Sequence, residues 1–147
     1  MEVKNLTIRL HGIEIVEKSL TATPLPPENQ EFNFDFDAKS GIDTDRKLLV
    51  VLLELSIRKG NEPNVIAKLT TATAFELPNI DQELPKLENG QYGIPNELDA
   101  MVKSIAISTA RGILFSEFRG TPLHKAFLPL IQLPTAQPIP ANTVPAN

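Results

Sequence analysis

The sequence predicts an α+β fold: a four-stranded antiparallel sheet with one long C-terminal helix packed on one face. Three observations predict it. Four segments alternate between apolar and polar residues, turn residues separate them, and the single segment with helical periodicity follows all four. A chain of 147 residues can bury such a core as one domain. We assign residues 1–133 to this domain and expect the neutral, proline-rich residues 134–147 to form a disordered tail.

The first strand is expected within "NLTIRLHGIEIVEKSL", where apolar residues alternate up to Leu10. The alternation resumes at Ile13 and Ile15 with the opposite parity. A β-bulge or bend at Gly12 would account for this change of phase.

The second strand is expected within "EFNFDFD", which places Phe32, Phe34 and Phe36 on one face and polar residues on the other. The stretch that follows, "KSGIDTD" at residues 39–45, is expected to be a loop.

The third and fourth strands, "KLLVVLLELSIRK" and "NVIAKLTTATAFEL", flank "GNEP" and are expected to form a hairpin. The third strand is apolar along one whole face, whereas its other face is apolar only at Leu48, Val50 and Leu52. A long connection, residues 78–95, comes next, and loops of this length are usually functional or mobile.

The helix is expected from about Glu97 to about Phe118, with Gly120 near its end. Asn96 is a good N-cap residue, and Glu97 and Asp99 suit the first turn because they face the positive end of the helix dipole.

The helix has two apolar stripes when its residues are placed at 100° intervals. The broad stripe, expected to lie on the sheet, comprises Leu98, Met101, Val102, Ile105, Ala106, Thr109 and Ile113. The second, nearly opposite, comprises Ala100, Ile107, Leu114 and Phe118. We expect the second stripe to be the interface of a dimer or tetramer; the alternative is that residues 119–131 fold back over it.

The composition argues against several classes of function. The net charge is −4, the basic residues are scattered and cysteine is absent, so nucleic acid, disulfides and thiolate metal sites are not expected. Neither His11 nor His124 has a metal-ligand spacing to a carboxylate, and no phosphate loop or nucleophile motif occurs. We therefore expect a binding protein, not an enzyme, with no metal or cofactor.

The apolar segments predict no membrane insertion. The N-terminal stretch "MEVKNLTIRLHG" lacks the apolar region of a signal peptide, and the run Leu48–Leu53 is far too short to span a bilayer. We expect a cytoplasmic location.

The order of elements and the junction after the helix resemble the SecB family of export chaperones. The most specific match is "EFRGT", in which Arg119, Gly120 and Thr121 fit the Arg-Gly-Thr that ends the family's long helix. "PLHKAFLPLI" then resembles the family's extended segment, with Pro129 in the place of its later proline. The opening "IRLHGIEIVEKSL" also resembles the family's interrupted first strand, and the likeness covers about residues 6–131.

The resemblance implies a homo-oligomeric, ATP-independent chaperone that holds extended apolar segments of unfolded or precursor polypeptides, with protein export as one setting. The client-binding residues would be Phe32, Phe34, Phe36, Leu123, Phe127 and Leu128. For the last three residues, an alternative is that they fill the seam between helix and sheet. Three other functions stay open: a dedicated partner in a toxin–antitoxin system, a structural oligomer without clients, and a small-molecule carrier that uses the space between sheet and helix.

The sequence departs from the family in ways that bear on SecA, the motor to which SecB delivers precursors. Alignment places Lys18 and Lys68 where the family has acidic residues that dock on SecA, while Glu14 keeps a third. The family's second helix is also replaced by the neutral tail. We therefore expect SecA to bind weakly or not at all.

Overall fold

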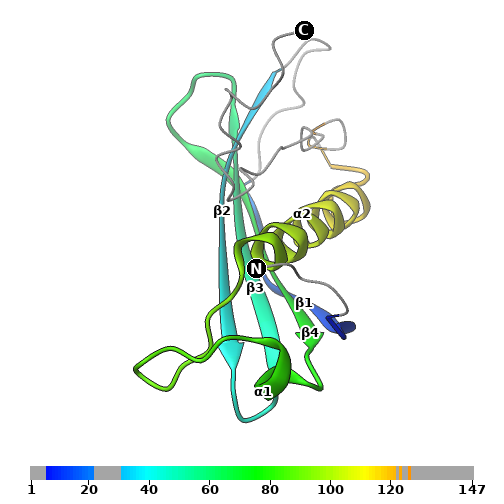
Figure 1. The fold of residues 1–147 in the computed structure, drawn as a ribbon. Coiled ribbons are helices and arrows are strands. Elements are labelled where there is room, and N and C mark those ends of the chain that lie inside the picture. The colour runs from blue at the N-terminus through cyan, green and yellow to red at the C-terminus, as the bar shows by residue number, and fades with distance from the viewer. Residues whose placement is uncertain (1–5, 22–30, 122, 124–125, 127–147) are drawn as a thin grey trace, which may run out of the picture.

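The computed structural model describes residues 6–21, 31–121, 123 and 126. Figure 1 shows its elements, with a sheet crossed on one face by the long helix. In chain order they are β1 (Arg9–Leu20), β2 (Phe32–Asp43), β3 (Leu48–Lys59), β4 (Val65–Glu76), α1 (Ile80–Glu83) and α2 (Asn96–Glu117).

The four strands form one antiparallel sheet in the order β1-β4-β3-β2. The predicted fold class is therefore confirmed. The apolar strands β3 and β4 form the centre of the sheet, and β1 and β2 form its two edges. Opposed residues of an antiparallel pair lie on the same face, so the registers show which side chains share the side that α2 covers. We call that face the helix side and the other the outer side.

The strand β2 is longer than the sequence predicts. It continues through Asp43, which pairs with Leu48, and the turn occupies only residues 44–47. The prediction of a loop from residue 39 is therefore wrong for its first five residues. Polar residues mislead here because β2 is an edge strand, and only alternate positions such as Ile42 reach the core.

The first strand contains the bulge expected at Gly12, because its register against β4 shifts between Leu10 and Gly12. A second register shift lies between Ile15 and Glu17, and the sequence analysis missed it. Each irregularity adds one residue and so exchanges the faces on which odd-numbered and even-numbered residues lie. The face of each residue after Leu10 must therefore be assigned from its partner in β4 and not by counting along the strand.

The helix α2 begins one residue before the predicted start and ends one residue before the predicted end. The N-cap is Pro95, whose carbonyl accepts the Asp99 amide at 2.9 Å. The predicted capping role of Asn96 is therefore wrong, since Asn96 is the first helical residue. Gly120 follows the helix with φ 76, a left-handed conformation that glycine adopts without steric cost.

The connection between β4 and α2 packs beneath the N-terminal half of the helix. Its residues Leu77, Ile80 and Leu84 are buried in a cluster with Leu98 and Val102 of α2. The connection thus completes the part of the core that lies around the N-terminal half of α2.

Buried residues on α2 recur at every fourth position. They are Leu98, Val102, Ala106, Ala110 and Leu114, and the C-cap residue Phe118 continues the series; Ile107 is buried beside them. A step of four residues turns about 40° further than one full helical turn, so the buried face winds around the helix by about 200° over its length. The N-terminal half packs with β3 and the end of β4, and the C-terminal half packs with β3, β4 and Leu123 and Ala126, which follow the helix.

This winding corrects the predicted interface. Ile107, Leu114 and Phe118 are buried by the same chain, so they offer no surface to a second subunit; Ala100 is half-buried. In the described residues, Leu123 and Ala126 cover this side of α2, as the alternative of a chain folding back expects. Met101 and Ile105, which were expected on the sheet, are exposed instead.

We predict that Leu114, from the second stripe, contributes more to stability than Met101, from the broad stripe. Leu114→Ala should lower the free energy of unfolding by about 2–5 kcal/mol, because it leaves a cavity in the core. Met101→Ala should lower it by less than about 1 kcal/mol, because Met101 is 40% exposed. Urea unfolding followed by circular dichroism measures both; a larger loss for Met101→Ala would contradict the assignment of faces.

Candidate functional site

The helix side of the sheet carries exposed apolar residues on its edge strands. On β1, Leu10, Ile13 and Ile15 pair with Phe75, Thr73 and Thr71 of β4, all buried on the helix side. Leu10 is nevertheless 56% exposed, Ile13 41% and Ile15 43%. We call these three residues the β1 edge patch. The chain's own helix does not bury them, because α2 packs on β2, β3 and β4.

The opposite edge carries the three phenylalanines that were predicted to bind clients. Phe34 and Phe36 pair with Ile57 and Leu55, so this aromatic row of β2 lies on the helix side. Phe32 and Phe34 are half-buried and pack against the core, whereas Phe36 is 38% exposed. The row therefore anchors the strand at one end and offers an aromatic surface at the other.

The remaining predicted client residues do not join this surface within the described chain. Leu123 is 1% exposed and packs in the same cluster as Leu114 and Phe118. Its predicted contact with a client is therefore wrong, and the alternative role at the seam of helix and sheet holds for it. Phe127 and Leu128 lie outside the described residues.

Lys18 and Lys68 do not lie on one surface. Lys68 is exposed on the outer side of β4, but Lys18 pairs with Leu69 on the helix side and its Nζ lies 2.7 Å from Glu117 of α2. The second bulge of β1 causes this, because it shifts the parity just before Lys18. The alignment that put both lysines on one docking face is therefore wrong for Lys18, and of the two lysines only Lys68 still supports the expectation of weak SecA binding.

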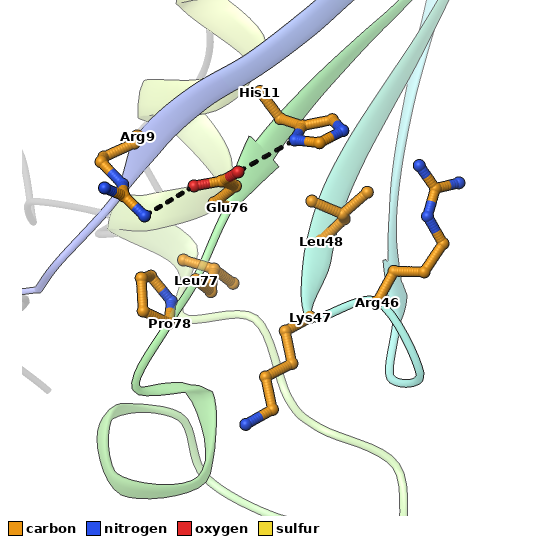
Figure 2. Close-up of a pocket in the computed structure, with 8 residues that line it drawn as sticks. All are labelled: Arg9, His11, Arg46, Lys47, Leu48, Glu76, Leu77 and Pro78. Atoms are coloured by element: carbon orange, nitrogen blue, oxygen red, sulfur yellow. Dashed lines mark hydrogen bonds and ion pairs between the residues drawn. The ribbon is translucent and has the colours of Figure 1, made fainter.

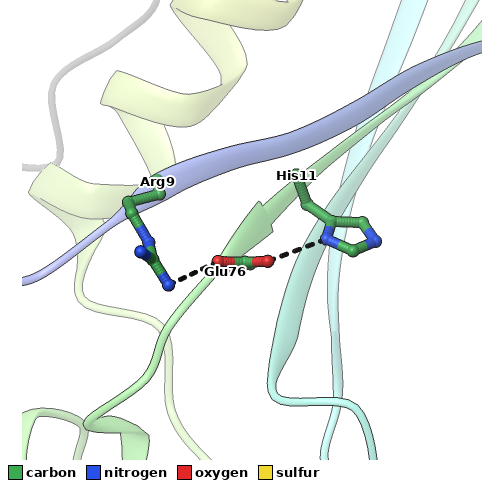
Figure 3. Close-up of polar contacts among 3 residues, drawn as sticks. All are labelled: Arg9, His11 and Glu76. Atoms are coloured by element: carbon green, nitrogen blue, oxygen red, sulfur yellow. Dashed lines mark hydrogen bonds and ion pairs between the residues drawn. The ribbon is translucent and has the colours of Figure 1, made fainter.

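The first bulge of β1 builds a polar cluster on the outer side (Figure 3). Glu76 of β4 lies between two residues of β1: its Oε2 is 2.8 Å from Arg9 Nη2, and its Oε1 is 3.0 Å from His11 Nδ1. The hydrogen bond with His11, helped by the charge of Arg9 and opposed by partial burial, lowers the pKa of Glu76 below its usual value.

The described residues contain no group of three or more histidine, cysteine, aspartate or glutamate side chains placed to hold a metal ion. Among the same residues, no helix has the length and apolar character needed to cross a membrane.

Sequence reasoning found the aromatic row but missed the β1 edge patch. The alternation of apolar and polar residues in β1 was visible in the sequence. Whether the apolar side chains of β1 are exposed, however, depends on how far α2 reaches across the sheet. The winding of the buried positions on α2 was a signal available in the sequence, since the four-residue spacing of Leu98, Val102 and Ala106 continues through Leu114.

Comparison with known proteins identifies the fold. No protein-family model matches the chain, and no curated protein matches it either. Among solved structures, the chain is similar to the SecB-like chaperone Rv1957 of Mycobacterium tuberculosis, solved in complex with a ChAD peptide from the antitoxin HigA1 (Rv1956). The similarity has a TM-score of 0.63 at 13% identity and covers 84% of this chain and 89% of that one. The fold of this chain is therefore SecB-like, as the resemblance of sequence implied.

We predict that the Glu76 carboxyl group titrates below the usual range of glutamate in a pH series of carbon-13 NMR spectra. The His11→Ala substitution should raise the midpoint, because it removes the largest of the causes that lower the pKa. Arg9→Ala should raise it by a smaller amount. An Arg9→Ala effect larger than that of His11→Ala would contradict the assigned order of causes.

Proposed function

We propose that this protein is an ATP-independent chaperone that binds extended apolar segments of unfolded polypeptides and holds them without catalysis. The observation that carries the proposal is the exposed apolar surface at both edges of the helix side of a SecB-like sheet, the β1 edge patch on β1 and Phe36 of the aromatic row on β2. A cytoplasmic site of action is part of the proposal.

The edges suit an extended chain for two reasons. In the described residues β1 pairs only with β4, and β2 only with β3, so each edge strand has unpaired backbone groups on its outer flank. An extended segment can pair with such an edge whatever its sequence, because the hydrogen bonds involve main-chain atoms. The neighbouring apolar side chains then select for apolar clients.

The energy available is enough for reversible holding. Fully burying one large apolar side chain contributes about 1.5–3 kcal/mol, and these residues are already partly buried. A client that covers Ile13 and Ile15, or Phe34 and Phe36, therefore gains a modest amount at each position. Ordering the client opposes this gain. Several edges acting together, as in an oligomer, would raise the overall affinity.

We also propose that the protein self-associates through the outward face of α2. The predicted stripe cannot serve, since its large residues are in the core. Met101 and Ile105, in contrast, lie on the outward face and are 40% and 39% exposed, with the small residues Ser108 and Gly112 further along. Small residues allow two helices to approach closely, and flanking apolar residues supply the buried area.

A dedicated partnership with one antitoxin is the second candidate function. The observation that favours it is the peptide from an antitoxin bound to the similar chaperone. The same uncovered edges would serve a single extended segment as well as many. The breadth of clients separates the two: a dedicated partner would fail to protect unrelated unfolded proteins. Delivery to SecA is not part of either proposal.

We predict that Phe36→Ala weakens binding of an unfolded, fluorescently labelled polypeptide several-fold, because it removes an exposed aromatic ring of the client surface. The free energy of unfolding should fall by less than about 1 kcal/mol, since Phe36 is outside the core. Asp37→Ala, on the outer side of the same strand, is the matched control and should bind normally. Equal binding by Phe36→Ala and the wild type would count against the aromatic row.

We predict that the double substitution Met101→Asp and Ile105→Asp reduces the mass measured by light scattering, because an interface between helices would bury unpaired carboxylates. Leu87→Asp is the control, since Leu87 is an apolar residue in the loop before α2 that is even more exposed, at 50%. A change in mass for Leu87→Asp alone would place the interface elsewhere.

A further inference from the structure

The outer side of the sheet carries a second site, which the proposed chaperone function does not use. A pocket of about 310 Å³ opens where β1, β4 and the turn between β2 and β3 meet, as Figure 2 shows. We call it the outer pocket. It is lined by Arg9, His11, Arg46, Lys47, Leu48, Glu76, Leu77 and Pro78.

The lining separates into an apolar floor and a basic rim. Leu48 and Leu77 are almost fully buried, at 2% and 0% exposure, and Pro78 lies beside them. The rest of the lining includes three basic residues, Arg9, Arg46 and Lys47, against a single carboxylate, Glu76. Because basic residues outnumber carboxylates in the lining, the outer pocket favours an anionic ligand.

The one carboxylate of the lining is already used. Glu76 is held by Arg9 on one oxygen and by His11 on the other. Arg46 and Lys47, in contrast, make no side-chain ion pair with any residue of the described chain. The acidic neighbour Asp43 accepts the backbone amide of Arg46 at 3.1 Å. Two cations of the rim are therefore available to a ligand.

The geometry of the turn fixes the backbone that carries these two cations. Lys47 has φ 54, a left-handed conformation that usually belongs to glycine, and its carbonyl accepts the Leu77 amide at 2.9 Å. Figure 2 shows Arg46 on the side of Leu48 away from Glu76. The second ring nitrogen of His11 points away from Glu76, toward the side that Arg46 borders.

The outer pocket continues into an apolar track across the sheet. The next residues on the outer side form the cross-strand row Gly12, Ala74, Val50 and Gly41, followed by Ala72 beside Leu52. Val50, Leu52, Gly41 and Ile42 line a neighbouring hollow of about 380 Å³, whose lining also includes the polar residues Lys39, Ser40 and Asp43. Glycine and alanine leave the larger side chains Val50 and Leu52 accessible, since a Cβ at either Gly12 or Gly41 would meet only open space.

We propose that the outer pocket and this track bind an extended acidic and apolar segment of a protein partner, with a carboxylate on the basic rim and apolar side chains over Val50 and Leu52. Charge complementarity identifies the ligand: the rim attracts an anion, while the floor and the track require that the anion be joined to apolar groups. A free phosphate would satisfy the rim alone. The site is independent of the proposed client surface, because it lies on the opposite face of the sheet.

The test measures fluorescence anisotropy of a short labelled peptide in which one glutamate precedes alternating leucine and threonine. Wild-type protein should bind it, and should bind the same peptide with glutamine in place of glutamate at least about tenfold more weakly. The protein variant Arg46→Gln with Lys47→Gly should bind the glutamate peptide more weakly than the wild type by the same factor. It should stay folded, because glycine readily adopts the backbone conformation of residue 47.

Three controls make the outcome decisive. Lys68→Gln removes a positive charge from the other end of the outer side and should change binding by less than about twofold, since screening limits the reach of exposed charges. Phe36→Ala should bind the acidic peptide normally, which separates this site from the client surface. Equal binding of the glutamate and glutamine peptides, or an unaltered affinity in the Arg46 and Lys47 variant, would overturn the proposal. Inorganic phosphate is the third control. If an acidic peptide without apolar residues bound as tightly as the test peptide, and inorganic phosphate displaced it as readily, the site would be one for free oxyanions. That result would also overturn the proposal.

Discussion

The structure depends on the difference in area between one helix and a four-stranded sheet. Each strand has 12 residues and is about 40 Å long at about 3.3 Å per residue, whereas a helix that crosses the strands covers a band only about 10 Å wide. A single helix therefore cannot cover the whole helix side. Because α2 packs on β2, β3 and β4, the uncovered residues fall mainly on β1, with Phe36 exposed on the other edge. The exposed apolar edges are a consequence of the architecture.

The two sides of the sheet differ in what they can bind. The helix side presents apolar side chains next to unpaired strand edges, which suits extended apolar chains. The outer side presents a basic rim at one end and an apolar track of small residues across its centre. The first bulge of β1 contributes to this division, since it directs His11 toward Glu76 while Leu10 stays on the helix side. The two proposed binding surfaces are in this way kept on opposite sides of the sheet.

The fold class and most element positions could be predicted because they depend on local patterns. The alternation of Phe32, Phe34 and Phe36 and the apolar run of β3 are such patterns. The buried face of α2 could not be predicted from a helical wheel, which assumes that the face stays on one side of the helix. The buried positions instead follow a four-residue spacing from Leu98 to Phe118, so the face winds around the helix. The outer pocket depends on contacts between residues as distant in sequence as His11 and Glu76, and no local pattern reports such a contact.

The central claim is that the uncovered strand edges hold extended apolar polypeptides, and hydrogen exchange tests it most directly. Mass spectrometry would compare the exchange of backbone amides in the free protein and in the presence of saturating unfolded polypeptide. The account predicts slower exchange in β1 or β2, because a bound chain would pair with edge groups that water reaches in the free protein. The central strands β3 and β4, which already pair on both sides, should change little. Protection confined to other parts of the chain, with both edge strands unchanged, would contradict the account.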